Sequence, residues 1–402
     1  RSQPDNAAST SGDVEIVYTG SGKDLVLSDN PADYSDRWVL AIAGGLEHIK
    51  AERGTTTFRT QEADSDIVVD GLSSAWTQGL GDVELIAGRD VLFEDGSSHF
   101  EGGDLTVTPG RRTTIETDVI VGNTASLTFN SDVEVPGFEA DIRAGQLTIT
   151  GNLLYRLPTY GDTDTAANVD IRARGQDGFA DIRGVVSIDA PDSHVRLIAK
   201  NNEVTDAILQ LGDIDALKFE LVTNDSTTVV QESGSRIKAR ELFLVGGGAS
   251  EALILNNDNL IDDLLGNISA PLQLTNSGTF TPGKANGLVI AVRTAGVSGT
   301  TYNGLVTNNQ DFTLTTDTNF SMVTQADLDL GTGVMTIRER DGTWEADTEE
   351  GGGISLGGDT GATLQIGGGL GIITASKTIF DTTLTGNDIF VNGVNYPGLG
   401  EL

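Results

Sequence analysis

Two clusters of oxygen-bearing side chains are the clearest candidates for chemistry in this sequence. Residues 161–165 read Gly-Asp-Thr-Asp-Thr, and residues 256–263 combine Asn-Asn-Asp-Asn with a pair of aspartates. Hard cations such as calcium prefer oxygen ligands in this kind of spacing. The sequence therefore indicates a calcium site with the candidate ligands Asp162, Asp164, Asp258 and Asp262. Neither cluster is a complete EF-hand loop, and ordinary Asx turns explain the same residues more simply.

Motifs for enzymatic catalysis are incomplete. Residues 353–357 match the G-x-S-x-G pattern, which requires a strand, a sharp turn, a helix and a histidine later in the chain. No histidine follows Ser355, since the three histidines are His48, His99 and His194. Residues 19–24, Thr-Gly-Ser-Gly-Lys-Asp, lack the first glycine and the final hydroxyl residue of a phosphate-binding loop. We therefore expect no enzymatic activity.

Polysaccharide cleavage or binding is the alternative that the residues leave open. The phrase Ala-Asp-Ile-Arg occurs at residues 140–143 and 180–183, with Val-Asp-Ile-Arg at 169–172. Paired acids or acid-and-arginine grooves cleave polysaccharides in some proteins. Stacked ion pairs on an exposed strand face explain the repeats better, and aromatic residues, which form sugar platforms, are only 5% of the chain.

The elements that carry these residues are short strands that recur at a regular interval. Strand centres fall at Leu85, Leu105, Leu127, Leu147 and Val169, with steps of 20, 22, 20 and 22 residues. Three short strands and three corners fit one such interval, and coils stacked about 4.8 Å apart would pair their backbones. The spacing predicts an all-β protein, a parallel β-helix (β-solenoid) of roughly 20–22 residues per coil. A chain of β-sandwiches is the alternative.

The pattern divides the chain into three regions. Residues 61–300 are expected to form the solenoid body, residues 1–60 strands that cap its first coil, and residues 301–402 an irregular, glycine-rich capping or assembly region. Segments 203–219 and 250–268 are rich in leucine. In the second, Leu260 and Leu264 show the four-residue spacing of a helix, which predicts short helices or loops at the corners.

Three phrases resemble a known class of surface protein. They are GDVELIAGRDVLF at residues 81–93, GQLTITGN at 145–152 and NSGTFTPG at 276–283. These phrases are similar to the repeats of filamentous-haemagglutinin-type adhesins and autotransporter passengers, over about residues 60–300. The resemblance implies a right-handed parallel β-helix on a bacterial surface. It implies no catalytic residues.

Composition restricts the partners and the location. Asp and Glu number 59 against 25 Lys and Arg, for a net charge of −34. Such a chain repels nucleic acid and anionic membranes, so neither is an expected partner. There is no cysteine and no apolar run long enough to span a bilayer, so no membrane insertion is expected. Because the chain starts at Arg1 with a polar segment, we expect a secreted protein whose signal peptide has been removed.

The C-terminal region carries the candidate assembly residues. Its closing segment offers apolar alternation and backbone groups that could pair with the open coil of another subunit. The candidates are Asp388, Ile389, Phe390, Val391, Asn395 and Tyr396. The alternative is that both ends fold back on their own domain. The sequence as a whole favours an extracellular, cell-surface structural protein that forms a filament, sheath or adhesive stalk by head-to-tail self-assembly. Binding to glycans of a host or of the environment is the neighbouring interpretation.

Overall fold

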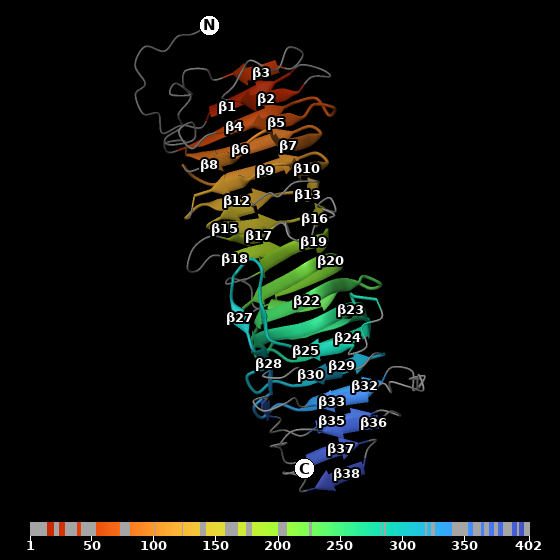
Figure 1. Ribbon diagram of the computed structural model, residues 1–402. Helices are drawn as coiled ribbons and strands as arrows, with labels where there is room; N and C mark the ends of the chain where they lie inside the picture. Colours follow the sequence, from red (N-terminus) through yellow and green to blue (C-terminus); the bar gives the residue numbers. More distant parts are fainter. Residues whose placement is uncertain are drawn as a thin grey trace. The chain divides into compact units, whose positions relative to one another are not determined.

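The computed structural model is all β. It describes residues 14–19, 24–28, 38–41, 54–72, 81–100, 102–122, 124–136, 142–156, 168–173, 179–199, 207–224, 227–282, 284, 287–317, 320–322, 326–339, 353–356, 363–365, 370–373, 377–380, 388–391 and 394–397. Within these residues every regular element is a strand, and the strands stack in parallel as a β-solenoid (Figure 1). The predicted fold class is therefore confirmed, and the β-sandwich alternative is wrong. The chain forms two compact units: unit 1 is residues 1–158 with 169–187, and unit 2 is residues 159–168 with 188–402.

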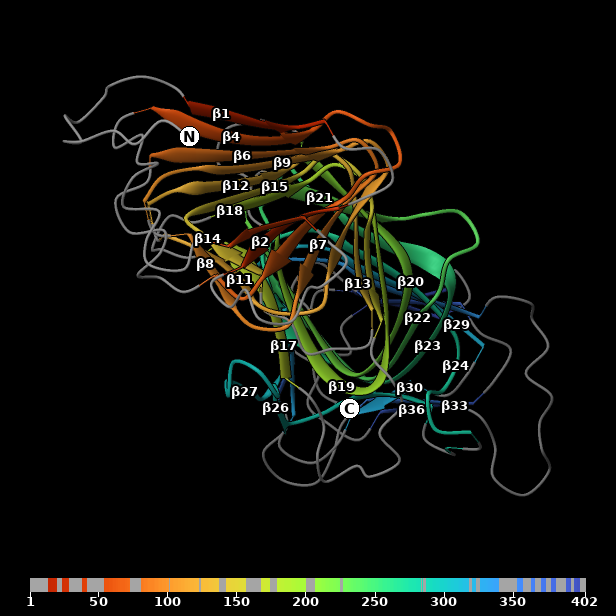
Figure 2. The same ribbon diagram turned by 90° about the horizontal axis from the view of Figure 1, so that it is seen from above.

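Unit 1 has three ladders of parallel strands, seen end on in Figure 2. The first contains β1 (Val14–Tyr18), β4 (Thr55–Thr60), β6 (Asp82–Ala87), β9 (Leu105–Pro109), β12 (Ser126–Phe129), β15 (Gln146–Ile149) and β18 (Phe179–Ile182). The second contains β3 (Trp38–Ala41), β2 (Leu25–Ser28), β5 (Ile67–Asp70), β7 (Asp90–Glu94), β10 (Arg112–Ile115), β13 (Asp132–Pro136) and β16 (Leu153–Arg156). The third contains β8 (Ser98–Phe100), β11 (Val119–Val121), β14 (Ile142–Ala144) and β17 (Asn168–Ala173). One coil therefore consists of three short strands and three corners, as the spacing predicts.

The core of unit 1 consists of apolar side chains stacked in register. Leu105, Leu127 and Leu147 occupy equivalent positions of successive coils, and none is exposed. The neighbouring inward column contains Val107 and Phe129. Intervening residues face outward, because successive strand residues point to opposite sides. Each coil thus buries its own apolar side chains on those of the coils before and after it.

The strand pairing predicted from the spacing differs from the observed pairing at both ends of the repeat. Val83, rather than Leu85, pairs with Leu105, so the first strand is offset by two residues. Leu147 pairs with Ala180, 33 residues further on, whereas Val169 lies in β17 on the third ladder. A regular spacing of strand centres cannot reveal this longer coil, because the additional residues of the coil lie between its strands.

Unit 2 begins with unusually long strands. These are β19 (Val185–Ala199), which starts at the boundary of the units, β20 (Ala207–Thr223), β22 (Ile237–Gly246) and β23 (Leu253–Ile268), with the short β21 (Thr227–Gln231) between them. The described parts of the leucine-rich segments, predicted as short helices or loops, are therefore strands, and that prediction is wrong. Residues 261–266 of β23 are all buried, because the core covers one face and a later hairpin covers the other. A strand buried on both faces lacks the apolar and polar alternation of a half-exposed strand, so its leucine spacing can resemble that of a helix.

Shorter coils follow and remain parallel. One ladder of unit 2 continues from β23 through β24 (Leu272–Gly278), β29 (Phe312–Thr316), β32 (Met335–Glu339), β35 (Leu370–Ile373) and β37 (Asp388–Val391). Beside it run β25 (Leu288–Ile290), β30 (Phe320–Met322), β33 (Gly353–Leu356) and β36 (Lys377–Phe380), and then β28 (Gly304–Val306), β31 (Asp327–Asp329) and β34 (Thr363–Gln365). The last strand, β38 (Val394–Pro397), runs antiparallel to β37. The G-x-S-x-G motif lies in β33, where Ser355 pairs with Ser321 inside a ladder.

Candidate functional site

The most elaborate arrangement of polar side chains in unit 2 lies under a hairpin that interrupts one coil. Residues 291–303, here called the strap, connect β25 to β28 and contain β26 (Arg293–Thr294) and β27 (Thr301–Tyr302). These two strands pair with each other in antiparallel orientation. The strap folds back over strands that precede it in the chain (Figure 1). It therefore covers side chains on the outer face of the long strands.

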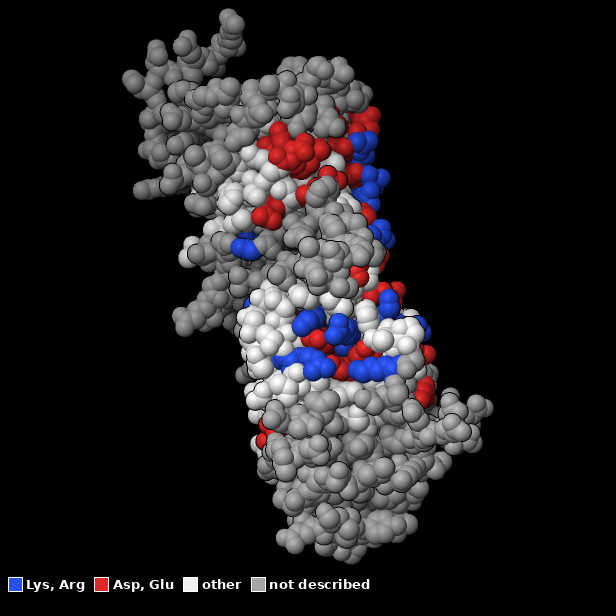
Figure 3. All heavy atoms as spheres, viewed as in Figure 1, with Lys and Arg blue, Asp and Glu red and all other residues white. Residues whose placement is uncertain are grey.

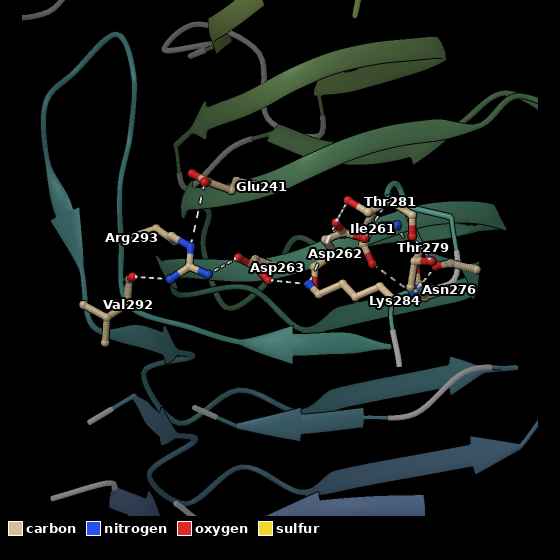
Figure 4. A network of polar contacts seen from close by, with 11 residues as sticks. Glu241, Ile261, Asp262, Asp263, Asn276, Thr279, Thr281, Lys284, Val292 and Arg293 are labelled. Carbon is tan, nitrogen blue, oxygen red and sulfur yellow. Dashed lines mark hydrogen bonds and ion pairs between the residues drawn. The ribbon is translucent and has the colours of Figure 1, made fainter. Parts of the chain in front are cut away.

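Strand register brings three charged residues into line under the strap. Lys218 of β20 pairs with Glu241 of β22, and Glu241 pairs with Asp263 of β23. Residues in register on adjacent strands lie about 4.8 Å apart, so two like charges, Glu241 and Asp263, are neighbours. Arg293 of the strap offsets their repulsion. Its Nη2 is 2.8 Å from Asp263 Oδ2, and its Nε is 3.8 Å from Glu241 Oε1 (Figure 4).

Two lysines complete this part of the network. Lys218 Nζ is 2.8 Å from Glu241 Oε2 and also donates to the Thr294 carbonyl at 3.0 Å. Lys284 Nζ lies 2.8 Å from Asp263 Oδ1 and 3.9 Å from Asp262 Oδ2 (Figure 4). Each of the two central carboxylates thus contacts more than one cation, as buried charges require.

Glu220 anchors the far part of the strap. Its Oε1 accepts hydrogen bonds from Ser298 Oγ at 2.9 Å and from Tyr302 Oη at 3.2 Å. Its Oε2 lies 3.3 Å from Arg196 Nε on β19. Burial, and then the charge and hydrogen bond of Glu220, raise the pKa of Tyr302 to about 12. Tyr302 therefore remains a neutral donor throughout the physiological range.

The acids of the network are covered and the cations reach solvent. The carboxylate side chains are 3–4% exposed, whereas those of Arg196, Lys218, Lys284 and Arg293 are 21–39% exposed. Lysine and arginine atoms accordingly gather on this face of unit 2 (Figure 3). The network places a partly exposed layer of cations over a buried layer of carboxylates, in a chain whose net charge is −34.

An apolar cluster adjoins the ionic network. Phe243, Leu265, Val289, Ala291 and Ala295 are buried together, and Tyr302 packs against them. The rings of Phe243 and Tyr302 have centroids 5.6 Å apart and are tilted by 49°. Tyr302 thus contributes its ring to the cluster and its hydroxyl to Glu220, so apolar and ionic contacts hold the strap together.

The predicted calcium ligands are only partly within the described residues. Asp162 and Asp164 lie outside them. Asp258 and Asp262 both lie on β23, where Asp262 accepts hydrogen bonds from Thr281 N at 3.2 Å and Thr281 Oγ1 at 2.6 Å. In the part of the chain that is described, no group of three or more His, Cys, Asp or Glu side chains could hold a metal ion. The calcium site stays a prediction.

The predicted assembly residues share one terminal hairpin. Asp388, Ile389, Phe390 and Val391 form β37, and Asn395 and Tyr396 lie in β38. Ile389 pairs with Tyr396 and Phe390 with Asn395. Their role in assembly stays a prediction, and the sequence analysis did not identify the network under the strap. Lys218, Glu241 and Asp263 do follow each other at 23 and 22 residues, so a search for charges at the coil period would have found them.

Comparison with known proteins leaves the fold as the defining feature. No family model matches the chain, and neither a curated protein nor a solved structure matches it significantly. Among the described residues no helix is long and apolar enough to cross a membrane. The fold defines a β-solenoid protein. The resemblance to filamentous-haemagglutinin-type adhesins stays a prediction.

Proposed function

We propose that this protein is an extracellular, non-enzymatic structural β-solenoid, a subunit of a surface filament, sheath or adhesive stalk that assembles head to tail through its terminal strands. The observation that carries the proposal is the set of strand edges at the ends of the ladders. Among the described strands, β1 pairs only with β4, and β38 pairs only with β37. An unpaired strand edge is a template for another strand.

The two ends differ in a way that suits a directional contact. Near the N-terminus, β3 stacks in parallel on β2, with Leu25 opposite Trp38, so the second ladder starts with β3. Near the C-terminus, β38 reverses direction after β37. Within the described residues, β36 pairs only with β33 and β34 only with β31. A contact between unlike ends is heterologous, and heterologous contacts that do not close produce filaments.

Charge sets the conditions for assembly. Two copies that each carry −34 repel each other, and this repulsion is screened beyond a Debye length of about 8 Å at physiological ionic strength. We therefore expect assembly to be weak at low salt and to increase with salt or divalent cations. Glycan binding by an assembled stalk is compatible with this function.

A proline substitution in the last strand tests the proposal. Asn395→Pro removes a backbone donor from β38, whereas Asn395→Ala at the same position retains it. Negative-stain electron microscopy and sedimentation are expected to show end-to-end assemblies for the wild type and Asn395→Ala, and shorter ones for Asn395→Pro. A wild-type protein that stays monomeric at high concentration across salt and calcium would contradict the proposal.

A further inference from the structure

The strap is attached to four successive long strands by side-chain contacts. Gly296 lies against His194 of β19, Ser298 bonds to Glu220 of β20, and Arg293 reaches both Glu241 of β22 and Asp263 of β23. Within the described residues, the strands β26 and β27 pair only with each other, so neither belongs to a solenoid ladder. At the end of the strap, the Asn303 carbonyl accepts a hydrogen bond from Asp327 N of β31 at 2.6 Å. Residues 291–302 can therefore detach without breaking a ladder.

Its polar anchors depend on carboxylate charge. Glu220, Glu241 and Asp263 face the strap, and Arg196, Lys218, Lys284 and Arg293 surround them. Hydrogen bonds between charged groups are stronger than those between neutral groups. A further positive charge beside these four cations would repel them and weaken the attachment of the strap.

His194 can supply such a charge. A side chain at position 296 would come within 2.3 Å of its ring, so the glycine allows the strap to lie directly on His194. Arg196 is two residues further along β19 and shares its face. Burial, and then the charge of Lys218, lower the pKa of His194 from 6.5. A proton on His194 would add a third cation beside Arg196 and Lys218.

The direction of the pH dependence follows from linkage. While the strap is closed His194 holds its proton more weakly than it would in water, so protons favour the open strap as the pH falls below 6.5. Tyr302, whose pKa is raised, remains neutral over this range and does not oppose opening.

Opening would uncover an apolar surface. Phe243, Leu265 and Val289 belong to the strands, whereas Ala291, Ala295 and Tyr302 belong to the strap and cover them. We propose that residues 291–303 form an acid-released strap, closed at neutral pH by ionic anchors on Glu220, Glu241 and Asp263, whose opening exposes the surface of Phe243, Leu265 and Val289. This inference does not depend on head-to-tail assembly.

Hydrogen exchange of the full-length protein tests the strap. After correction for the intrinsic pH dependence of exchange, the amides of residues 291–303 are expected to exchange at least about tenfold faster near pH 4.5 than near pH 7.5, as in a local opening. The amides of β9, β10 and β12 are expected to keep their protection. A dye that binds apolar surface should bind in acid while the β-sheet circular dichroism is unchanged. Constant protection of the strap, or its loss together with that of the coils, would overturn the proposal.

Substitutions separate the contributions. His194→Gln keeps a neutral, polar side chain and is expected to move the opening midpoint to lower pH, whereas His99→Gln on β8 of unit 1 leaves it unchanged. Tyr302→Phe retains the ring on Phe243 but loses the bond to Glu220, so the strap should already exchange faster near pH 7.5. If His194→Gln and His99→Gln have the same midpoint as the wild type, and Tyr302→Phe exchanges like the wild type, the proposed anchors are wrong.

Discussion

Asp90 accepts hydrogen bonds from Nε and Nη2 of Arg111, a residue one coil further along unit 1. The Nε bond is 2.8 Å long. One coil earlier, Asp66 accepts the same pair of bonds from Arg89. Arginine and acid thus alternate from coil to coil at this corner of unit 1. This geometry, together with the backbone ladders, links each coil to the next.

Removal of this arginine should weaken the stack. Arg111→Gln removes the bidentate partner of Asp90, which is 6% exposed. Asp90 then keeps only the Arg112 amide at 3.3 Å and Arg89 Nε at 3.9 Å, and a buried carboxylate with fewer partners is less favourable. We expect a lower melting temperature in a thermal unfolding experiment. Arg156→Gln is the matched control, because Arg156 meets Glu134 at 3.4 Å in an exposed pair of the kind that contributes only about 0–1 kcal/mol. Equal melting temperatures for the two variants would show that the corner pair does not contribute.

Asp90 should also give unit 1 a specific dependence on acid. Burial alone would raise the pKa of Asp90, but the hydrogen bond and charge of Arg111 lower it below 3.8. A group whose pKa is lowered by folding stabilises the fold above its unfolded pKa and loses this effect as the pH falls through its folded value. Asp90→Asn is therefore expected to reduce the fall in melting temperature below about pH 4. If the melting temperature of Asp90→Asn falls with decreasing pH as steeply as that of the wild type, this assignment is wrong.

Close backbone contacts at the corners require glycine. A Cβ at Gly110 would lie 2.1 Å from the carbonyl oxygen of Gly88 in the preceding coil. Because that atom is backbone, Gly110→Ala must displace a coil, and we expect a loss of more than about 2 kcal/mol in denaturant unfolding. Gly234→Ala is the control, since it has a φ of +83° and nothing within 4 Å. It should cost only the left-handed penalty of about 1–2 kcal/mol. Similar losses for both would exclude the contact as the cause.

The buried amide of Asn259 lies at an irregularity in the pairing of β23 with β24. Its Oδ1 accepts from Ile237 N at 2.8 Å, and its Nδ2 donates to the carbonyls of Leu255 and Thr275, each at 3.0 Å. Asn259→Ala would leave these buried backbone groups unpaired, at about 1–3 kcal/mol for each unsatisfied group. Asn256→Ala, on the same strand but exposed, is expected to change the free energy of unfolding by less than about 0.5 kcal/mol. If Asn259→Ala is as stable as Asn256→Ala, water must replace the amide.

The regular part of the fold was predictable because each coil repeats the same physical requirement. Leu105, Leu127 and Leu147 stack because the period places one inward leucine per coil. The period does not reveal where a coil is lengthened, which is why Val169 belongs to a different ladder from Leu147.

The strap was not predictable from the same pattern. The strap covers the outer face of β23, so both faces of this strand are buried. The residues from Ile261 to Leu265 therefore lack the alternation of a half-exposed strand, and their spacing resembles that of a helix. Arg293 and Tyr302 come from the strap, residues 291–303, which interrupts one coil, and nothing in their spacing indicates which strands they reach. The charged residues beneath them follow the coil period at 23 and 22 residues, but that spacing does not indicate that a strap covers them.

X-ray fibre diffraction from aligned assemblies of the purified protein tests the central claim most directly. If parallel coils stack along the axis of a head-to-tail filament, a meridional reflection near 4.8 Å is expected, since strands perpendicular to the axis repeat at about that distance. Its absence from filaments, or a protein that yields only separate particles at every salt concentration, would contradict the account.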